Sequence, residues 1–171
     1  MSEKFSNEKI FVKNIPEFEN EQITPIEKDY YNVIAINTVI TFLIFTVAYF
    51  ISLNAFEFLR NIEFKLLLTV CYFVFWFFLF IYGWYAFKKR GYCFREHDVI
   101  YKFGLFEETV VLIPFNRIQH IALHQGIFSR IYGLASLQFY TAGGSTTDIN
   151  IKGFKLEDAK KFKEFVSNKI E

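Results

Sequence analysis

The chain has 171 residues, enough for one domain of ordinary size and a smaller unit but not for two large domains. With 19 Lys and Arg against 18 Asp and Glu, the net charge of +1 provides no overall field to attract nucleic acid or an acidic substrate. Hydrophobic residues make up 53% of the chain and aromatic residues 21%, which is too apolar for a disordered protein. The composition therefore predicts a folded chain that does not bind nucleic acid.

The N-terminal segment, residues 1–32, is acidic and precedes the first apolar stretch. It carries seven Asp or Glu residues and four Lys residues. It lacks the basic start followed by a short apolar run that marks a signal peptide. We therefore expect these residues to form a cytosolic arm.

Two segments without a single charged residue follow, at residues 33–56 and 66–87. At about 1.5 Å per helical residue, each would span roughly 33 to 36 Å, which exceeds the ~30 Å of a hydrocarbon core. A buried helix of a soluble core is the alternative, but such helices are shorter and usually keep a polar stripe. The sequence predicts a transmembrane hairpin over residues 33–87.

The end of the second segment has the composition of a membrane-interface anchor. Trp84 and Tyr85 are followed by Lys88, Lys89 and Arg90, and aromatic rings backed by basic residues settle at headgroup depth. The same basic cluster would attract anionic lipid, although anchoring explains it equally well. Because this side of the hairpin is more basic than the short connector, we expect a multi-pass protein of the cytoplasmic (inner) membrane with both termini in the cytosol.

From residue 91 onward the pattern changes to short alternating segments separated by turn residues, which indicates β-strands. Pro114 belongs near a strand end because it cannot donate a hydrogen bond to a sheet. An amphipathic helix is predicted at the C-terminus, with acidic residues first and lysines later. The predicted strands lie at residues 91–95, 99–103, 109–113, 118–125, 137–141 and 147–151, with a short linking segment at 126–133 and the helix at 156–170.

Three motifs in this region resemble those of bacterial PH-like, membrane-flanked proteins of the YdbS-like type. They are residues 113–121 (IPFNRIQHI), 130–135 (RIYGLA) and 141–144 (TAGG). The resemblance implies a PH-like domain over residues 91–171, a bent barrel of about seven strands capped by the C-terminal helix. Asn116 departs from the pattern, because Asp is frequent at that place.

We find no constellation that predicts catalysis, a cofactor or a metal site. His120 and His124 would suit a metal if they lay on a helix, but on a strand they are about 13 Å apart at ~3.3 Å per residue. No nucleophile occurs beside a base, and Gly143 and Gly144 lack the Lys-Ser or Lys-Thr of a phosphate loop. The predicted spans contain no ionisable group, which argues against transport by this chain alone.

The polar residues of the matching motifs, Arg117, Gln119 and Arg130, together with Pro114, are the candidates for a partner contact. A structural role is the alternative, in which an Arg binds backbone carbonyls at a barrel corner.

The function predicted from the sequence is a membrane-anchored PH-like interaction module or scaffold on the cytosolic face. Its partners would be the lipid bilayer and other membrane proteins, including a related PH-like protein, and a homo-oligomer is compatible with this role. The alternative function is an auxiliary subunit of a transport or envelope-stress resistance complex that acts through its transmembrane helices.

Overall fold

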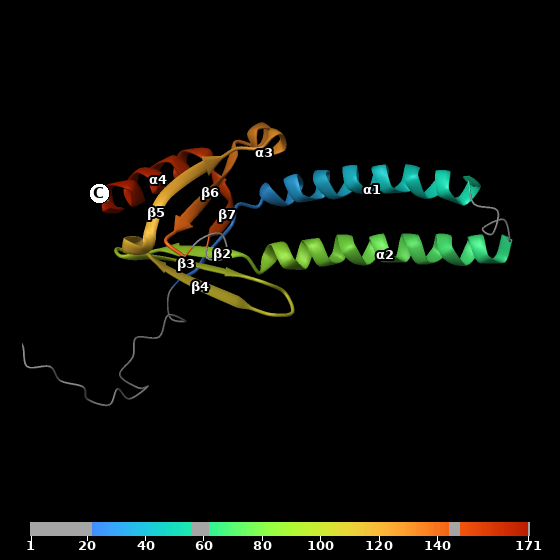
Figure 1. Cartoon of the computed structure of the whole chain (residues 1–171), viewed down its shortest axis with the longest axis horizontal. Helices are drawn as coiled ribbons and strands as arrows, with labels where there is room; N and C mark the ends of the chain where they lie inside the picture. Colours follow the sequence, from blue (N-terminus) through green and yellow to red (C-terminus); the bar gives the residue numbers. More distant parts are fainter. Residues whose placement is uncertain (1–21, 56–61, 144–147, 171) are drawn as a thin grey trace, which may run out of the picture.

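The computed structural model describes residues 22–55, 62–143 and 148–170, which form a long helical hairpin joined at one end to a β-rich domain (Figure 1). Helix α1 (Tyr30–Ala55) and helix α2 (Ile62–Lys88) lie side by side. The β domain follows α2 directly, and the C-terminus lies at the end of the molecule remote from the tip of the hairpin (Figure 1).

Both helices are apolar all round, and most of the exposed large hydrophobic side chains of the described residues lie on them. Both are long and apolar enough to cross a membrane. They begin earlier than the predicted spans, at Tyr30 instead of residue 33 and at Ile62 instead of residue 66. The reason is that helix formation continues past the uncharged segment. Glu63 in the first turn and Lys88 in the last turn of α2 both suit the helix dipole.

Aromatic stacking and two hydroxyl pairs join the helices. The rings of Tyr49 and Tyr72 stack with centroids 4.5 Å apart. The Thr46 hydroxyl donates to its own helix at the carbonyl of Phe42, so the Tyr72 hydroxyl, 2.8 Å away, must donate to Thr46. These contacts matter because lipid provides no hydrophobic force between two helices.

Seven strands form two antiparallel sheets in the described part of the chain, with orders β1-β2-β3-β4 and β5-β6-β7. A 3₁₀ turn η4 (Phe115–Arg117) links the sheets, α3 (Ile127–Ile131) links β5 to β6, and α4 (Leu156–Ile170) follows β7. This architecture confirms the predicted fold class, a membrane hairpin with a mainly-β PH-like domain. The strands are β1 (Thr24–Pro25), β2 (Gly91–Phe94), β3 (Asp98–Phe103), β4 (Thr109–Pro114), β5 (Ile118–His124), β6 (Leu134–Thr141) and β7 (Ile149–Lys155).

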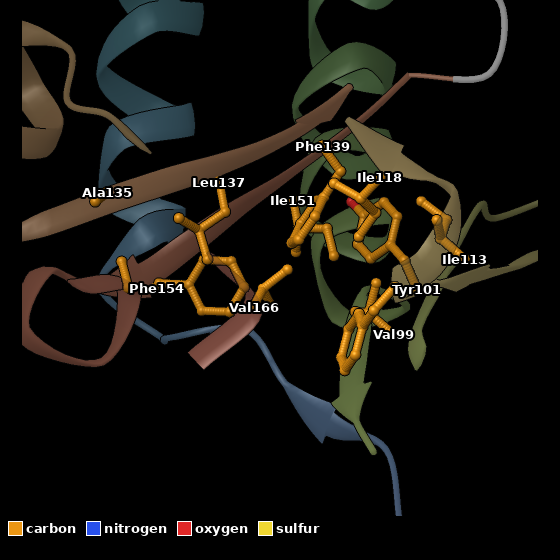
Figure 2. Close-up of a cluster of buried hydrophobic side chains, with 12 residues drawn as sticks. Val99, Tyr101, Ile113, Ile118, Ala135, Leu137, Phe139, Ile151, Phe154 and Val166 are labelled. Carbon is orange, nitrogen blue, oxygen red and sulfur yellow. The ribbon is translucent and has the colours of Figure 1, made fainter. Parts of the chain in front are cut away.

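The core of the domain lies between the two sheets and is closed by α4 (Figure 2). Leu137, Phe139, Ile151 and Phe154 of the second sheet are fully buried there. Leu137 and Phe139 alternate along β6, as expected for a sheet with one covered face. Ile151 and Phe154 of β7 are three positions apart, because the register between β6 and β7 shifts between them. From α4, Ala159 and Val166 reach the core, which explains the apolar spacing of the C-terminal helix.

Strand β1 joins the start of the hairpin to its end. It precedes α1 and pairs with β2, the strand that follows α2, through Thr24 opposite Tyr92 and Pro25 opposite Gly91. A side chain at Gly91 would overlap that of Ile23, so only glycine allows this close approach. Residues 24–25 thus belong to the sheet instead of a separate arm, whereas residues 1–21 of the predicted arm lie outside the described residues. The sequence did not predict this pairing, because a two-residue strand that contains Pro has no alternating pattern.

A second joint connects β7 to the beginning of α1. Gly153 has φ +87° and sits where the register between β6 and β7 shifts. A Cβ atom there would lie 3.0 Å from the Tyr30 ring and 3.2 Å from Ile26. The backbone N–H of Glu27 donates to the Gly153 carbonyl at 3.0 Å. The hairpin is therefore packed against both sheets of the domain.

Candidate functional site

A cavity of about 900 Å³ lies between strand β4 of one sheet and strand β7 of the other. Within the described residues, each of these strands is the edge of its sheet. Residues 111–114 of β4 line the cavity consecutively, and so do Asp148, which precedes β7, and the first two residues of β7. Successive side chains of a strand point to opposite faces, so consecutive lining residues mean that the strand edges face the cavity. Such edges can accept another extended chain.

The walls of the cavity combine apolar side chains with an excess of positive charge. The apolar part comes mainly from Tyr101, Phe103, Val111, Ile113 and Ile149. The charged lining residues are three basic ones and one acidic one, Arg90, Arg117, Lys152 and Asp148. This chemistry favours an anionic ligand that also carries apolar groups.

Two polar side chains of the walls, Asp148 and Tyr101, have a defined hydrogen bond or protonation state. Asp148 accepts a hydrogen bond from the backbone N–H of Thr141 at 3.0 Å, which fixes the acidic side chain against the wall. Burial raises the pKa of Tyr101, while the positive charge of Arg90 acts in the opposite direction. Tyr101 therefore stays protonated at neutral pH, with a hydroxyl that can donate a hydrogen bond.

A smaller cavity of about 260 Å³ lies where the chain leaves α2. Lys88, Lys89, Arg90 and Lys102 line it, and Lys102 pairs with Glu108 at 2.6 Å. Arg90 belongs to both cavities, so the basic surface at the base of the hairpin continues into the larger cavity.

The aromatic part of the predicted interface anchor packs beside this basic surface. The Lys88 ammonium lies 3.6 Å from the centroid of the Trp84 ring. The Trp84 and Tyr85 rings are 4.8 Å apart in an edge-to-face arrangement. The aromatic and basic members of the anchor thus form one continuous cluster at the domain end of α2.

The structure brings only part of the predicted motif to the large cavity. Pro114, at the end of β4, and Arg117, in η4, line it. Gln119 on β5 and Arg130 on α3 are exposed and lie outside it. Lys152 also lines the cavity but could not be predicted as a site residue, because a lysine at an outward position of a strand carries no signal of its own.

The histidines considered as metal ligands lie on strand β5. The His120 ring stacks on that of Tyr140 with centroids 4.1 Å apart. The part of the chain that the structure describes contains no group of three His, Cys, Asp or Glu residues suited to a metal ion.

Comparison with known proteins identifies the family. The chain matches the sequence model described as Bacterial PH domain over residues 34–170, which includes most of both helices and the β domain through α4. The chain belongs to the bacterial PH domain family. Among relatives of this bacterial PH domain protein is the UPF0699 transmembrane protein YdbS of Bacillus subtilis (strain 168), which is 30% identical over 73 residues. That alignment covers 43% of this chain and 44% of YdbS, so the chain matches less than half the length of that relative.

No solved structure matches this bacterial PH domain protein. The family match and the YdbS relative confirm the resemblance inferred from residues 113–121, 130–135 and 141–144. Together with the two apolar helices, they identify a membrane protein that carries a PH-like domain.

Proposed function

We propose that the protein is a membrane-tethered interaction module whose large cavity binds an acidic, extended segment of another membrane protein. The observation that carries the proposal is the cavity between the edges of β4 and β7, with Arg90, Arg117 and Lys152 in its walls. Main-chain hydrogen bonds to an edge strand supply affinity in this mode of recognition, and side-chain pockets supply specificity. Positive charges favour a segment rich in Asp and Glu.

Tethering makes a weak contact of this kind useful. The domain is attached directly to the end of α2, so the cavity stays close to the membrane surface. Confinement near a membrane-bound partner raises the effective concentration of the two binding sites, and a weak affinity then gives substantial occupancy. A related PH-like protein that presents an acidic loop is a partner of the proposed chemistry.

The proposed role requires no catalysis. Among the described residues that line the large cavity there is no Cys, Ser or His, the side chains that most often supply a nucleophile or its base. Binding and release are therefore the activities to test.

We place the domain on the cytosolic side, in a multi-pass arrangement with both termini inside. The support is that Lys88, Lys89 and Arg90 lie at the end of the hairpin that carries the domain, and positive residues favour the cytosolic side. A reporter that functions only in the cytosol should be active when it is fused after Glu171. Activity of a reporter that requires export would contradict this orientation.

Site-specific photo-crosslinking in native membranes tests the binding function. Leu112 lines the cavity and is 45% exposed, so a benzoylphenylalanine there should capture the partner without disturbing the core. Reversing two wall charges, with Arg117→Glu and Lys152→Glu, should lower the yield of the protein adduct about tenfold, corresponding to a loss of about 1.4 kcal/mol. The matched control is Lys160→Glu, an exposed charge on α4 outside the cavity, which should leave the yield unchanged.

Two results would contradict the proposal. One is a protein adduct at Leu112 whose yield is the same in the double variant and in the control. The other is an adduct formed only when the crosslinker replaces Phe77, an exposed residue of α2, which would favour a subunit that acts through its membrane helices.

A further inference from the structure

The loop between β3 and β4, residues 104–108, extends from the domain alongside α2 (Figure 1). Its Phe106 side chain is 91% exposed. The Phe106 ring nevertheless stacks on that of Tyr82 in α2, with centroids 6.0 Å apart and planes inclined by 17°. The tip of a domain loop therefore lies beside the membrane helix itself.

The position of Tyr82 fixes the depth that this loop reaches. Tyr82 precedes Lys88 by six residues, which corresponds to about 9 Å along a helix at ~1.5 Å per residue. The headgroup region on each side of a bilayer is roughly 5 to 7 Å thick. With the backbone of Lys88 at the outer edge of the headgroup region, the backbone of Tyr82 reaches the boundary of the hydrocarbon core, and the Phe106 ring stacks on the Tyr82 side chain there.

Helix α3 forms a similar projection beside the start of α1 (Figure 1). Phe128 packs against the buried cluster at the base of α1 that includes Ile26 and Val33. Ile127 and Ile131, four residues apart and therefore on one helical face, remain 80% and 72% exposed. In Figure 1, α3 lies on the α1 side of the hairpin and the β3–β4 loop on the α2 side, both at the level where the helices enter the domain.

We propose that the β domain is docked on the lipid bilayer at two points on opposite sides of the hairpin, through Phe106 on one side and through Ile127 and Ile131 on the other. The depth of Tyr82 and continuity with two membrane helices identify lipid as the occupant of these apolar surfaces. Transfer of exposed aromatic and aliphatic side chains from water to this depth of the bilayer is favourable, as it is for amphipathic interfacial segments.

The charges around the loop show that apolar contact, not electrostatic attraction, would hold it there. Glu107 and Glu108 directly follow Phe106, and anionic headgroups repel both. Glu108 is paired with Lys102, which partly offsets that repulsion. Docking of the loop should therefore occur on neutral lipid and should not weaken at high salt.

Two-point docking would keep the domain from tilting about the hairpin. The rim of the large cavity near Arg90 would then stay at a fixed height above the bilayer. The inference depends on the membrane placement of the helices but not on what the cavity binds, so its test is independent of the proposed partner.

Depth-dependent fluorescence quenching in the full chain tests this docking. In a Cys71→Ala, Cys93→Ala background, a single cysteine replaces Phe106, Ile131 or the control residue Glu96 and carries an environment-sensitive dye. The protein is reconstituted in phosphatidylcholine vesicles that contain lipid with a nitroxide near the top of the acyl chain. Glu96 is exposed and lies in the turn before β3, at the end of that strand opposite to Phe106.

The dye should be quenched several-fold more at positions 106 and 131 than at position 96, with no change in 1 M salt. Equal quenching at the three positions would overturn the proposal and would leave the apolar surfaces for a protein partner. Quenching at only one of the two apolar positions would overturn docking at two points. If the cysteine-free background does not fold, benzoylphenylalanine at position 106 of the chain with its native cysteines should crosslink to lipid, and no lipid adduct there would equally refute the proposal.

Discussion

Replacing Gly153 with Ala tests how tightly the membrane hairpin is joined to the β domain. Gly153 combines two constraints, a φ of +87° and a site for Cβ only 3.0 Å from the Tyr30 ring. Two other glycines separate these constraints. Gly133 has φ +62° but open space around its Cβ position, whereas Gly126 has φ −71° and open space.

The structure sets the expected order of destabilisation. A left-handed backbone costs a residue with a Cβ about 1 to 2 kcal/mol, so Gly133→Ala should lower the free energy of unfolding by that amount. Gly153→Ala adds the cost of an overpacked contact, about 1 to 3 kcal/mol, for a total of roughly 2 to 5 kcal/mol. Gly126→Ala should change the free energy of unfolding by less than about 1 kcal/mol, because restriction of the unfolded chain is opposed by the loss of a favourable N-cap residue of α3.

Thermal unfolding of the full-length variants in detergent micelles, followed by loss of the β-sheet circular dichroism signal, measures this order. At about 4 to 8 °C per kcal/mol for a domain of this size, Gly153→Ala should lower Tm by at least about 8 °C. Asn tolerates positive φ, so Gly133→Asn should recover part of the loss at that position, whereas Gly153→Asn should not. If Gly153→Ala were no more destabilising than Gly133→Ala, the Tyr30 contact would not constrain the joint and our reasoning would be wrong.

Two further predictions concern a titrating group and a hydrogen bond. Burial, with a further contribution from the carboxylates of Asp158 and Glu27, raises the pKa of Tyr92 from 10.0 to about 12. The unfolded chain therefore loses this proton first, and the free energy of unfolding should fall as pH rises from 10 to 12. In denaturant titrations at pH 9 and 11, Tyr92→Phe should make that fall shallower, and an unchanged slope would contradict the assignment. In the hairpin, a double-mutant cycle of Thr46→Val and Tyr72→Phe should give a coupling of about 0.6 kcal/mol in mixed-micelle unfolding, and additive effects would show that the 2.8 Å hydrogen bond contributes nothing.

The helices and most strands could be predicted because their signals are local. An uncharged run longer than twenty residues and a short alternating segment each report on neighbouring positions. Strand β6 is longer than predicted and begins at Leu134, because residues 134–136, which lie between the predicted link and the predicted strand, already pair with β7. Strand β7 reaches Lys155 instead of residue 151, since the bulge at Gly153 interrupts its alternation without ending its pairing.

The candidate site was only partly predictable because it is assembled from distant segments. Arg117 and Pro114 stand in a recognisable motif, but Arg90 and Lys152 meet them only after both sheets have formed. Phe106 lies between two predicted strands, and its contact partner Tyr82 lies 24 positions earlier in the chain. Local sequence patterns carry no information on contacts between residues that are distant in the chain.

The pairing of β1 with β2 restricts how α1 and α2, the two legs of the hairpin, can move relative to each other. One strand leads into the bilayer and its neighbour leads out, and they pair antiparallel with Thr24 opposite Tyr92 and Pro25 opposite Gly91. Movement of one helix past the other along the membrane normal would have to break the pairing between β1 and β2. The legs must therefore travel as a unit, and any mechanical signal passing between lipid and domain takes the form of a shared tilt or rotation.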